Sequence, residues 1–399
     1  MEKHDVVIVG AGFGGLKAAE KLAIRDKDVL VLDKQPEDRI GDRPHLGIIA
    51  PNAMNFVSPS LYQKMYAPKI YMMEHLLDVA GMLDIKVAVV DPLEMGQWQV
   101  KEAKKRGAEI RGESYVKKVV KKQNKVVLKN GEEIEYNYLI ASDGSTSVVA
   151  KSLGLEMFNK MFVYYYIVDE RLKDFELIMD SSENEGWYWT GIVPHGKQTY
   201  IGSGYGNRAV KCSERGRVLK KFMFKHRGID LEGGRFRAAP INWSYNGFKH
   251  RNIFFVGNAA SFQNPTFFLG VSSAFKSGEA AAKAILGEDY KSDLKEALRF
   301  HKSGGQLYTL MAKTGLFGGG ANFNLDKMNT SLDRYAKVFM KFGDSRFGTF
   351  ALGGINRHLG KLLKSHPTIS LPLYLTLIMS PASFNSFESI KEIVDFAFC

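Results

Sequence analysis

The 399-residue chain has only two cysteines, Cys212 and Cys399. Two thiols so far apart provide no disulfide framework, so this usage favours a reducing cytoplasm. Cys399 is not followed by the residues that a prenylation site requires. The first residues already read as strand sequence, and we therefore expect no signal peptide. These features together predict a cytoplasmic protein.

Long hydrophobic runs are also missing. The longest apolar stretch near the C-terminus covers residues 371–379 (LPLYLTLIM), well short of the roughly 20 residues that a membrane-spanning helix needs. Such a stretch is typical of a buried core helix. A helix that contacts a lipid-like ligand or a membrane surface is the alternative.

Charge of one sign is not concentrated in any one segment. The net charge is +12, but the basic residues are spread along the chain, and the densest cluster, residues 117–125, alternates with valines as a solvated sheet face does. We therefore expect no nucleic-acid partner. A diffuse positive field favours anionic ligands, and peripheral contact with the inner face of a membrane stays open for the same reason.

The order of predicted elements indicates an α/β protein, α+β overall. Residues 5–9 and 28–32 are apolar runs typical of buried parallel strands. The segment between them has apolar residues at the spacing of a helix. We predict a discontinuous nucleotide-binding domain (1–157 and 245–288), an antiparallel β substrate domain (158–244) and a helical C-terminal region (289–399). More locally, we expect largely helical structure over 80–107, a type I′ hairpin turn at Asn130-Gly131, mostly short strands over 158–241 and a helix over 271–285.

A dinucleotide fingerprint, Gly10-Ala11-Gly12-Phe13-Gly14-Gly15, follows the first strand directly and opens a helix. Gly10 permits the tight turn, Gly12 lets the backbone approach a pyrophosphate, and Gly15 allows close helix–strand packing. The helix N-terminus supplies unpaired N–H groups for phosphates. Asp33, at the end of the second strand, is suited to a ribose diol and would repel a 2′-phosphate.

Two later segments favour FAD over NAD. Residues 138–145 (YLIASDGS) and 252–260 (NIFFVGNAA) each run from a strand end into a small-residue turn with a polar side chain. Parallel strand ends meet at one sheet edge, where an extended dinucleotide lies. We therefore predict a Rossmann-type FAD-binding domain with a three-layer ββα sheet.

With these motifs in order, the sequence resembles the geranylgeranyl reductase family, within the FAD-dependent hydroxylase-fold oxidoreductases. The resemblance covers roughly residues 5–290. The family's Ala-Asp-Gly pattern is matched by Ala141-Ser142-Asp143-Gly144, and its Gly-Asp-Ala-Ala pattern by Gly257-Asn258-Ala259-Ala260. Asn264-Pro265 and Ser277-Gly278-Glu279 follow as they do in the family. The resemblance implies an FAD-dependent reductase of C=C bonds in isoprenoid chains.

The active-site motifs depart from the family. Where the family often has Arg-Cys-Gly-Glu-Gly, this chain has Arg43-Pro44-His45-Leu46-Gly47. The family's Tyr-x-Trp-x-Phe-Pro motif corresponds to residues 189–194 (WTGIVP), which keep the proline and an aromatic residue at the first position. Asn258 stands where the family's third motif has an acidic residue. Phe268 stands where the family has a glycine before the helix. These departures indicate a divergent member.

The candidate site residues follow from these motifs. The residues predicted to bind FAD are Gly10, Gly12, Phe13, Gly14, Gly15, Asp33, Lys34, Arg43, Asp143, Gly144, Gly257, Asn258, Ala259, Gly270 and Val271. His45 is the candidate catalytic residue, because an imidazole with an ordinary pKa near 6.5 suits proton transfer; a loop histidine without a role is the alternative. Trp189, Phe267 and Phe268 are the candidate substrate-binding residues, and no metal is predicted.

Three functions stay open from the sequence. The first is reduction of an apolar isoprenoid or lipid-like molecule, with an external electron donor, NAD(P)H or a ferredoxin-like protein, because the fingerprint occurs only once. The second is an FAD-dependent monooxygenase or halogenase acting on an aromatic substrate. The third is a flavin- or lipid-binding paralogue without catalysis, which the altered active-site motifs suggest.

Overall fold

A computed structural model describes residues 2–72, 75–77, 86–155, 160–179, 189–205, 212–242, 245, 247–263, 269–298 and 301. The chain divides into two units. The main unit comprises residues 1–66, 87–174 and 190–308, and the smaller unit comprises residues 67–86, 175–189 and 309–399. Most of the helical C-terminal region predicted from residue 289 on lies outside the described residues, and the predicted three-domain division stays a prediction.

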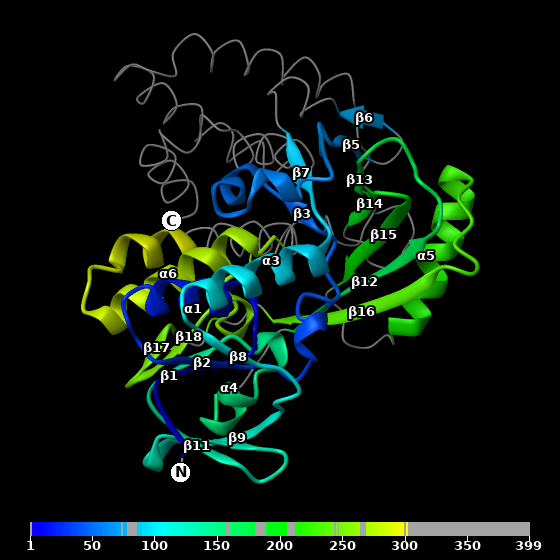
Figure 1. The fold of residues 1–399 in the computed structure, drawn as a ribbon. Coiled ribbons are helices and arrows are strands. Elements are labelled where there is room, and N and C mark those ends of the chain that lie inside the picture. Colours follow the sequence, from blue (N-terminus) through cyan, green and yellow to red (C-terminus); the bar gives the residue numbers. More distant parts are fainter. Residues whose placement is uncertain are drawn as a thin grey trace, which may run out of the picture. The chain divides into compact units, whose positions relative to one another are not determined.

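A mostly parallel sheet forms the centre of the main unit (Figure 1). Its order is β17 (Lys249–His250), β18 (Ile253–Phe255), β11 (Glu133–Ala141), β1 (Glu2–Val9), β2 (Val29–Leu32) and β8 (Glu109–Arg111). The pairs from β18 to β8 along this order are parallel. The inner strands are buried along most of their length, which explains why they read as continuous apolar runs. The predicted α/β class and Rossmann-type fold are confirmed.

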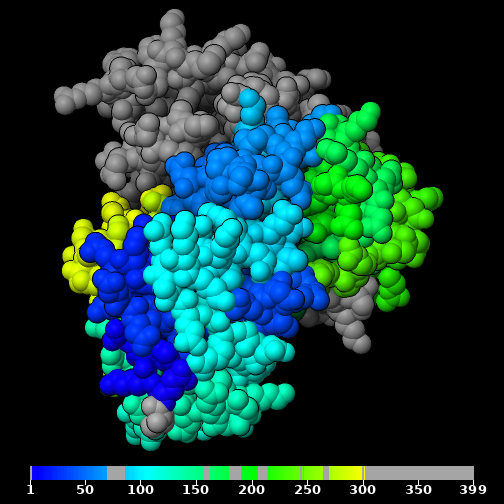
Figure 2. Space-filling model, viewed as in Figure 1, coloured from blue at the N-terminus to red at the C-terminus, as the bar shows by residue number. Residues whose placement is uncertain are grey.

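Helices α1 (Phe13–Ala23), α3 (Pro92–Lys105), α4 (Val148–Ser152) and α6 (Val271–Leu286) accompany this sheet. α1 packs against both α6 and α3, and the outer side chains of α3, cyan in Figure 2, lie at the surface. The carboxylate of Asp91 caps α3 by accepting hydrogen bonds from the N–H groups of Leu93 and Glu94. No helix in the described part of the chain is long and apolar enough to cross a membrane.

Two antiparallel strands extend the sheet beyond β11. β10 (Lys125–Leu128) pairs with β11, and β9 (Val116–Val120) pairs with β10. Asn130 and Gly131 lie in the loop that joins β10 to β11. The hairpin predicted at Asn130-Gly131 is present, but the predicted type I′ turn is wrong. Gly131 has φ +92°, whereas Asn130 is not left-handed, and its side chain instead accepts the N–H of Glu132 at 3.0 Å. A four-residue loop with one glycine in the left-handed region replaces the two-residue turn.

An antiparallel sheet also belongs to the main unit. Its order there is β16 (Arg235–Asn242), β12 (Lys160–Val168), β15 (Gln198–Tyr205) and β14 (Trp189–His195), of which Thr190 onward lies in this unit. α5 (Cys212–Arg227) packs against β12. The expectation of mostly strands over 158–241 therefore missed a helix, which buries Leu219, Phe222 and Met223 and exposes charged side chains.

A small sheet corrects the helical prediction for residues 80–107. β7 (Val87–Val89) pairs antiparallel with β3 (Ile48–Ile49) and β4 (Lys64–Tyr66), and the helix begins only at Pro92. The short β-branched run is fully buried, and burial in a sheet outweighs the helical pattern that follows it. Short 3₁₀ helices are η1 (Glu37–Arg39), η2 (Pro51–Phe56), η3 (Pro59–Leu61), η4 (Lys121–Gln123), η5 (Gly144–Thr146) and η6 (Gly257–Ala259).

The smaller unit contains three described strands. β5 (Lys69–Met72) pairs parallel with β13 (Glu176–Met179) and antiparallel with β6 (His75–Leu77). The N–H of Lys69 donates to the carbonyl of Phe175 at 2.8 Å. β5 therefore has a partner strand on each side.

Glycines bring α1 and α6 into backbone contact. A Cβ atom at Gly278 would lie 2.2 Å from the carbonyl oxygen of Gly14, and one at Gly14 would lie 2.6 Å from that of Ala274. Next to Gly278, the Ser277 hydroxyl accepts the N–H of Gly257 at 3.0 Å, and Glu279 pairs with Lys21. The Ser-Gly-Glu motif thus joins the glycine turn at Gly10–Gly15 to the one at Gly257.

We predict that Gly278→Ala destabilises the protein by about 2 kcal/mol, although alanine favours a helix by about 1 kcal/mol. The added methyl group meets backbone that cannot rotate away. Urea unfolding measures the change. Gly287→Ala, at φ +76° with nothing within 4 Å, is the control, and it should cost about 1 kcal/mol for backbone strain alone. A more stable Gly278→Ala variant would contradict the backbone contact.

Candidate functional site

The first glycine turn joins β1 to α1 and is fastened to the end of β2. Gly10 has φ +90°, and its N–H donates to the carbonyl of Leu32 at 2.7 Å. The Asp33 carboxylate accepts the N–H of Ala11 at 2.7 Å with one oxygen and that of Gln35 at 2.9 Å with the other. Asp33 therefore shapes the loop and stays partly exposed, while the neighbouring Lys34 is exposed.

The N-terminus of α1 is open. Its N-cap residue is Gly12, and no side chain caps it. The N–H of Gly15 donates to the hydroxyl of Ser142 at 3.0 Å, whereas the N–H groups of Phe13 and Gly14 have no partner among the described residues. Free N–H groups and the positive end of the helix dipole favour a phosphate group.

The second turn lies directly against the first. A Cβ atom at Gly10 would be 2.6 Å from the Ser142 carbonyl oxygen and 2.7 Å from the Asp143 Cα. One Asp143 oxygen, Oδ2, accepts the N–H groups of Val148 and Val149. The other, Oδ1, is buried without a partner in the part of the chain that the structure describes. Burial raises the pKa of Asp143, although the hydrogen bonds it accepts act in the opposite direction. Oδ1 is thus an acceptor available to a ligand hydroxyl group.

The third turn completes the set. η6 contacts η5 of the second turn and α6, and Gly257 has φ +56°. The Asn258 side chain is exposed, while Ala259 and Val271 are buried. α6 begins after Gly270 without a side-chain cap, so among the described residues a second helix N-terminus is open at this edge. The structure therefore brings the three predicted turns together at the carboxyl ends of β1, β11 and β18.

Arg43 reaches this edge from the loop before β3. Its Nη2 donates to the carbonyl of Ala11 at 3.1 Å, and the guanidinium lies 4.4 Å from the ring centre of Phe13. Its Nε is buried without a partner. Burial lowers the pKa of Arg43, and Asp33 opposes that shift. Arg43 thus anchors the first turn, and its Nε–H is a donor that an anion could use.

His45 lies in the same loop, beside Phe13, with ring centroids 5.6 Å apart. Its Nδ1 accepts the N–H of Gly47 at 2.9 Å, and its Nε2 has no partner in the described part of the chain. Burial, Arg43 and His195 lower the pKa of His45 to about 4. The ordinary pKa that suggested an acid is therefore absent, and the ring is neutral at physiological pH. Its catalytic role stays a prediction.

Residues that sequence reasoning did not single out hold this loop. The backbone N–H of His45 donates to the Tyr165 hydroxyl at 3.1 Å, and His195 Nε2 donates to the Leu46 carbonyl at 2.8 Å. Arg237 pairs with Asp42 at 2.6 Å. Tyr165 lies within the aromatic run Tyr164–Tyr166 of the sequence, and the other residues stand in no pattern that indicates this role. Of the predicted substrate residues, Phe267, Phe268 and the Trp189 side chain lie outside the described residues.

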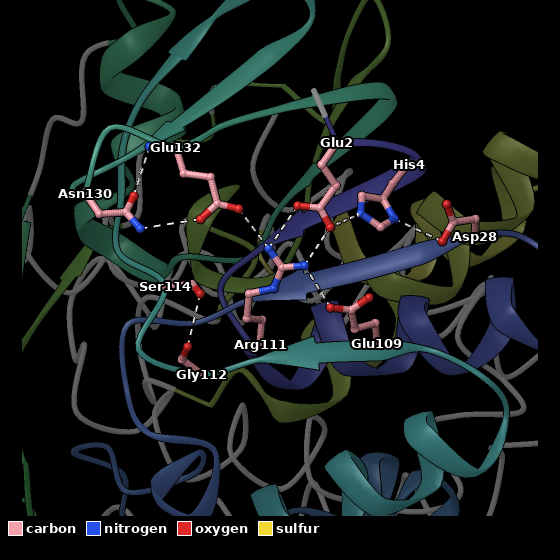
Figure 3. A network of polar contacts seen from close by, with 9 residues as sticks. All are labelled: Glu2, His4, Asp28, Glu109, Arg111, Gly112, Ser114, Asn130 and Glu132. Carbon is pink, nitrogen blue, oxygen red and sulfur yellow. Dashed lines mark hydrogen bonds and ion pairs between the residues drawn. The ribbon is translucent and has the colours of Figure 1, made fainter.

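A second polar cluster lies away from these turns (Figure 3). Ligand atoms of Glu2, His4 and Glu109 lie within 4.8 Å of one another. However, the Arg111 guanidinium already bonds to Glu2, Glu109 and Glu132. Hydrogen bonds from Arg111 and His4 lower the pKa of Glu2 to about 2. We interpret the cluster as an ion-pair network that fixes the start of β1.

The comparisons with known proteins agree with this geometry. An FAD-binding domain family matches residues 3–197. A digeranylgeranylglycerophospholipid reductase from Sulfolobus acidocaldarius is 25% identical over 334 residues, covering 71% of this chain and 69% of its own. The chain is therefore similar, at low identity, to digeranylgeranylglycerophospholipid reductases. It therefore has an FAD-binding fold of the oxidoreductase type, and the predicted resemblance and cofactor are confirmed.

Solved structures show the same fold. A geranylgeranyl bacteriochlorophyll reductase-like protein from Thermoplasma acidophilum superposes with TM-score 0.62 at 20% identity, covering 77% of this chain and 88% of that one. A myxobacterial FAD-dependent halogenase, the chondrochloren halogenase, superposes with TM-score 0.59 at 16% identity, covering 87% and 91%. A reductase-like protein and a halogenase therefore share the architecture of this chain.

The residues at the convergent turns fit FAD. Two uncapped helix ends suit the pyrophosphate, the partly exposed Asp33 suits a ribose, and the orphaned Oδ1 of Asp143 suits a hydroxyl donor. The close backbone contacts at Gly10 and Gly12 leave no room there for side chains. The individual binding roles stay predictions.

We predict that Gly12→Ala lowers FAD affinity at least tenfold, which is about 1.4 kcal/mol. The new Cβ atom would lie 2.5 Å from the Ser142 hydroxyl and would displace the turn from the helix end. Titration of flavin-free protein with FAD, followed by flavin fluorescence, measures the affinity. Gly107→Ala, at φ +101° with nothing within 4 Å, is the control. Equal affinity in both variants would remove the first turn from the site.

We also predict that His45 makes stability depend on pH. Its folded pKa, about 4, lies below the ordinary 6.5, so the unfolded chain binds more protons between these values and stability falls as the pH drops through this window. His45→Asn keeps an acceptor for the Gly47 N–H but does not titrate. Between about pH 7 and 5, urea unfolding should show wild type losing about 1–2 kcal/mol more than this variant. Parallel losses would show that His45 is already protonated or exposed.

Proposed function

We propose that this protein is an FAD-dependent reductase of C=C bonds in isoprenoid or prenyl-lipid chains. The observation that carries the proposal is the convergence of three glycine turns in a chain related to digeranylgeranylglycerophospholipid reductases. The relatives supply the substrate class, and the geometry supplies a site for the cofactor. An external donor, NAD(P)H or a ferredoxin-like protein, would provide the electrons.

Reduced FAD, when bound, supplies hydride to a carbon of the double bond. The chain's residues bind the cofactor and control protons and water. The open ends of α1 and α6 favour negative charge at the cofactor. His45 holds a proton at Nε2 beside Phe13, as a neutral hydrogen-bond donor rather than an imidazolium.

The region expected around the substrate is aromatic and poor in acids. Tyr164 and Tyr165 on β12 are buried, as is Val193 on β14. The two inner bulky positions of the family's pocket motif are here Gly191 and Val193, which are smaller than the Trp and Phe of that motif. We infer that the substrate is apolar and that its shape differs from that of the family's substrates. Peripheral membrane contact is part of the proposal, since such a substrate resides in a bilayer.

The proposal predicts reduction of a geranylgeranylated lipid by the FAD-loaded protein. Under anaerobic conditions with dithionite as reductant, mass spectrometry should detect a gain of two hydrogens per reduced bond. Gly12→Ala without FAD should show no gain. His45→Asn should load FAD but turn over at least tenfold more slowly, at the lower end of what a positioned proton-handling group contributes. An FAD-loaded wild-type protein that leaves every isoprenoid chain unreduced would refute the proposal.

A second candidate is an FAD-dependent monooxygenase or halogenase of an aromatic substrate. The halogenase structure covers 87% of this chain, whereas the reductase-like structure covers 77%. This larger coverage supports the second candidate. Oxygen-dependent NAD(P)H consumption that increases with an aromatic substrate would identify this function. FAD binding without turnover in either assay would support the third candidate, a flavin- or lipid-binding paralogue.

A further inference from the structure

The Leu46–Gly47 peptide group lies between two histidine rings. Its carbonyl oxygen accepts a hydrogen bond from Nε2 of His195 at 2.8 Å, and its N–H donates to Nδ1 of His45 at 2.9 Å. One amide group thus connects a ring on β14 with the candidate proton-handling ring in the loop. The two histidines belong to segments about 150 residues apart in sequence.

The chemistry of the amide assigns both protons. A carbonyl oxygen only accepts, so Nε2 of His195 must carry a hydrogen; an amide N–H only donates, so Nδ1 of His45 must be unprotonated. His45, when neutral, therefore carries its hydrogen on Nε2. Protonating its Nδ1 would require the Gly47 hydrogen bond to break.

His195 is placed to enforce this arrangement. Its side chain is buried, with 4% exposed, and its ring stacks on Tyr200 with centroids 4.0 Å apart. Tyr200 stacks in turn on Tyr165, whose hydroxyl accepts the backbone N–H of His45. The stack of side chains from β14, β15 and β12 therefore makes two hydrogen bonds to the loop.

Nδ1 of His195 is buried and has no partner among the described residues. An unsatisfied buried acceptor costs about 1–3 kcal/mol, so packing alone would be better served by an apolar ring. What an apolar ring would lose is the bond from Nε2 to the Leu46 carbonyl. Gly47 adds a steric reason, because a Cβ atom there would lie 2.5 Å from Cε1 of His195. The loop and this ring are fitted to each other.

We propose that His195 is a positioning residue: it acts through the Leu46–Gly47 peptide group to hold His45 as a neutral imidazole with its hydrogen on Nε2. A hydrogen bond accepted by an amide carbonyl polarises that amide and strengthens its N–H as a donor. The His195 bond therefore strengthens the Gly47 bond to His45 Nδ1. The catalytic meaning of this arrangement rests on the proposed function, whereas the tautomer itself does not.

The charged groups around the pair act on its titration. Arg43 from the same loop and His195 from β14 lower the pKa of His45. Burial lowers the pKa of His195, with the Leu46 carbonyl and Asp91 acting against it. Tyr165 and Tyr200 face the pair from β12 and β15, and burial raises the pKa of both. Arg237 on β16, paired with Asp42, completes this set.

NMR of the full-length protein with ¹⁵N-labelled histidine tests the proposal without any substrate. The chain has nine histidines, and His45→Asn identifies the His45 signals by their loss. In the wild type we expect the Nε2–H tautomer of His45, persisting to about pH 5. In His195→Phe, which keeps a ring on Tyr200 but has no donor, we expect mixed tautomers and titration of His45 about one pH unit higher, a tenfold change in proton affinity.

His195→Gln is the matched rescue, because its amide N–H can donate to the Leu46 carbonyl; it should restore the wild-type tautomer. A folded His195→Phe variant with unchanged His45 tautomer and titration would overturn the proposal. If that variant does not fold, the wild-type spectrum still decides, since an Nδ1–H or mixed tautomer of His45 contradicts it. A failed reductase assay with the expected spectra would reject the proposed function alone.

Discussion

Backbone contact between a glycine turn and its neighbours is the constraint on which the rest of this structure depends. Gly10, Gly12 and Gly15 lie against the Ser142–Asp143 turn, and Gly14 lies against α6, at separations where a Cβ atom has no room. This proximity places the open ends of α1 and α6 at one edge of the parallel sheet. The contacts of Gly10 and Gly14 are made with main-chain atoms, while Gly12 and Gly15 also lie against the small Ser142 side chain, so together they determine the spacing of the three turns.

That constraint explains which parts of the site could be predicted from the sequence. Gly10 and Gly257 take left-handed φ values, and Asp33 fastens the turn to β2. The type and position of these residues were therefore sufficient to predict the turns from the sequence. The parallel strands of the Rossmann-type domain could be predicted because each is a buried apolar run, whereas their order in the sheet came from the structure. FAD binding can therefore be inferred at 25% identity to a named reductase, because the cofactor-binding geometry resides in the backbone.

The remaining features depend on tertiary contacts that no local pattern records. Val87–Val89 becomes a strand because β3 and β4 lie on either side of it. α5 replaces expected strand because its apolar side packs on a sheet that forms elsewhere. Asn130 avoids the left-handed region because its side chain can accept the N–H of Glu132. His195 gave no sequence signal at all, since its role depends on a loop about 150 residues earlier.

The substrate side of the site obeys a different rule. There, under the proposed function, recognition would depend on single side chains. This chain has Gly191 and Val193 where the family's motif has Trp and Phe, and its three glycine turns still converge. The loop at Arg43–Gly47 combines both rules. Arg43 still contacts the first turn through Ala11, whereas the neutral His45 replaces the family's residues with a different hydrogen-bonding group. An imidazole kept neutral by burial and by the Gly47 N–H can orient a ligand through Nε2, but it cannot store an extra proton at physiological pH. Under the proposed function, either a bound anionic group raises the proton affinity of His45, or the final proton comes from another source.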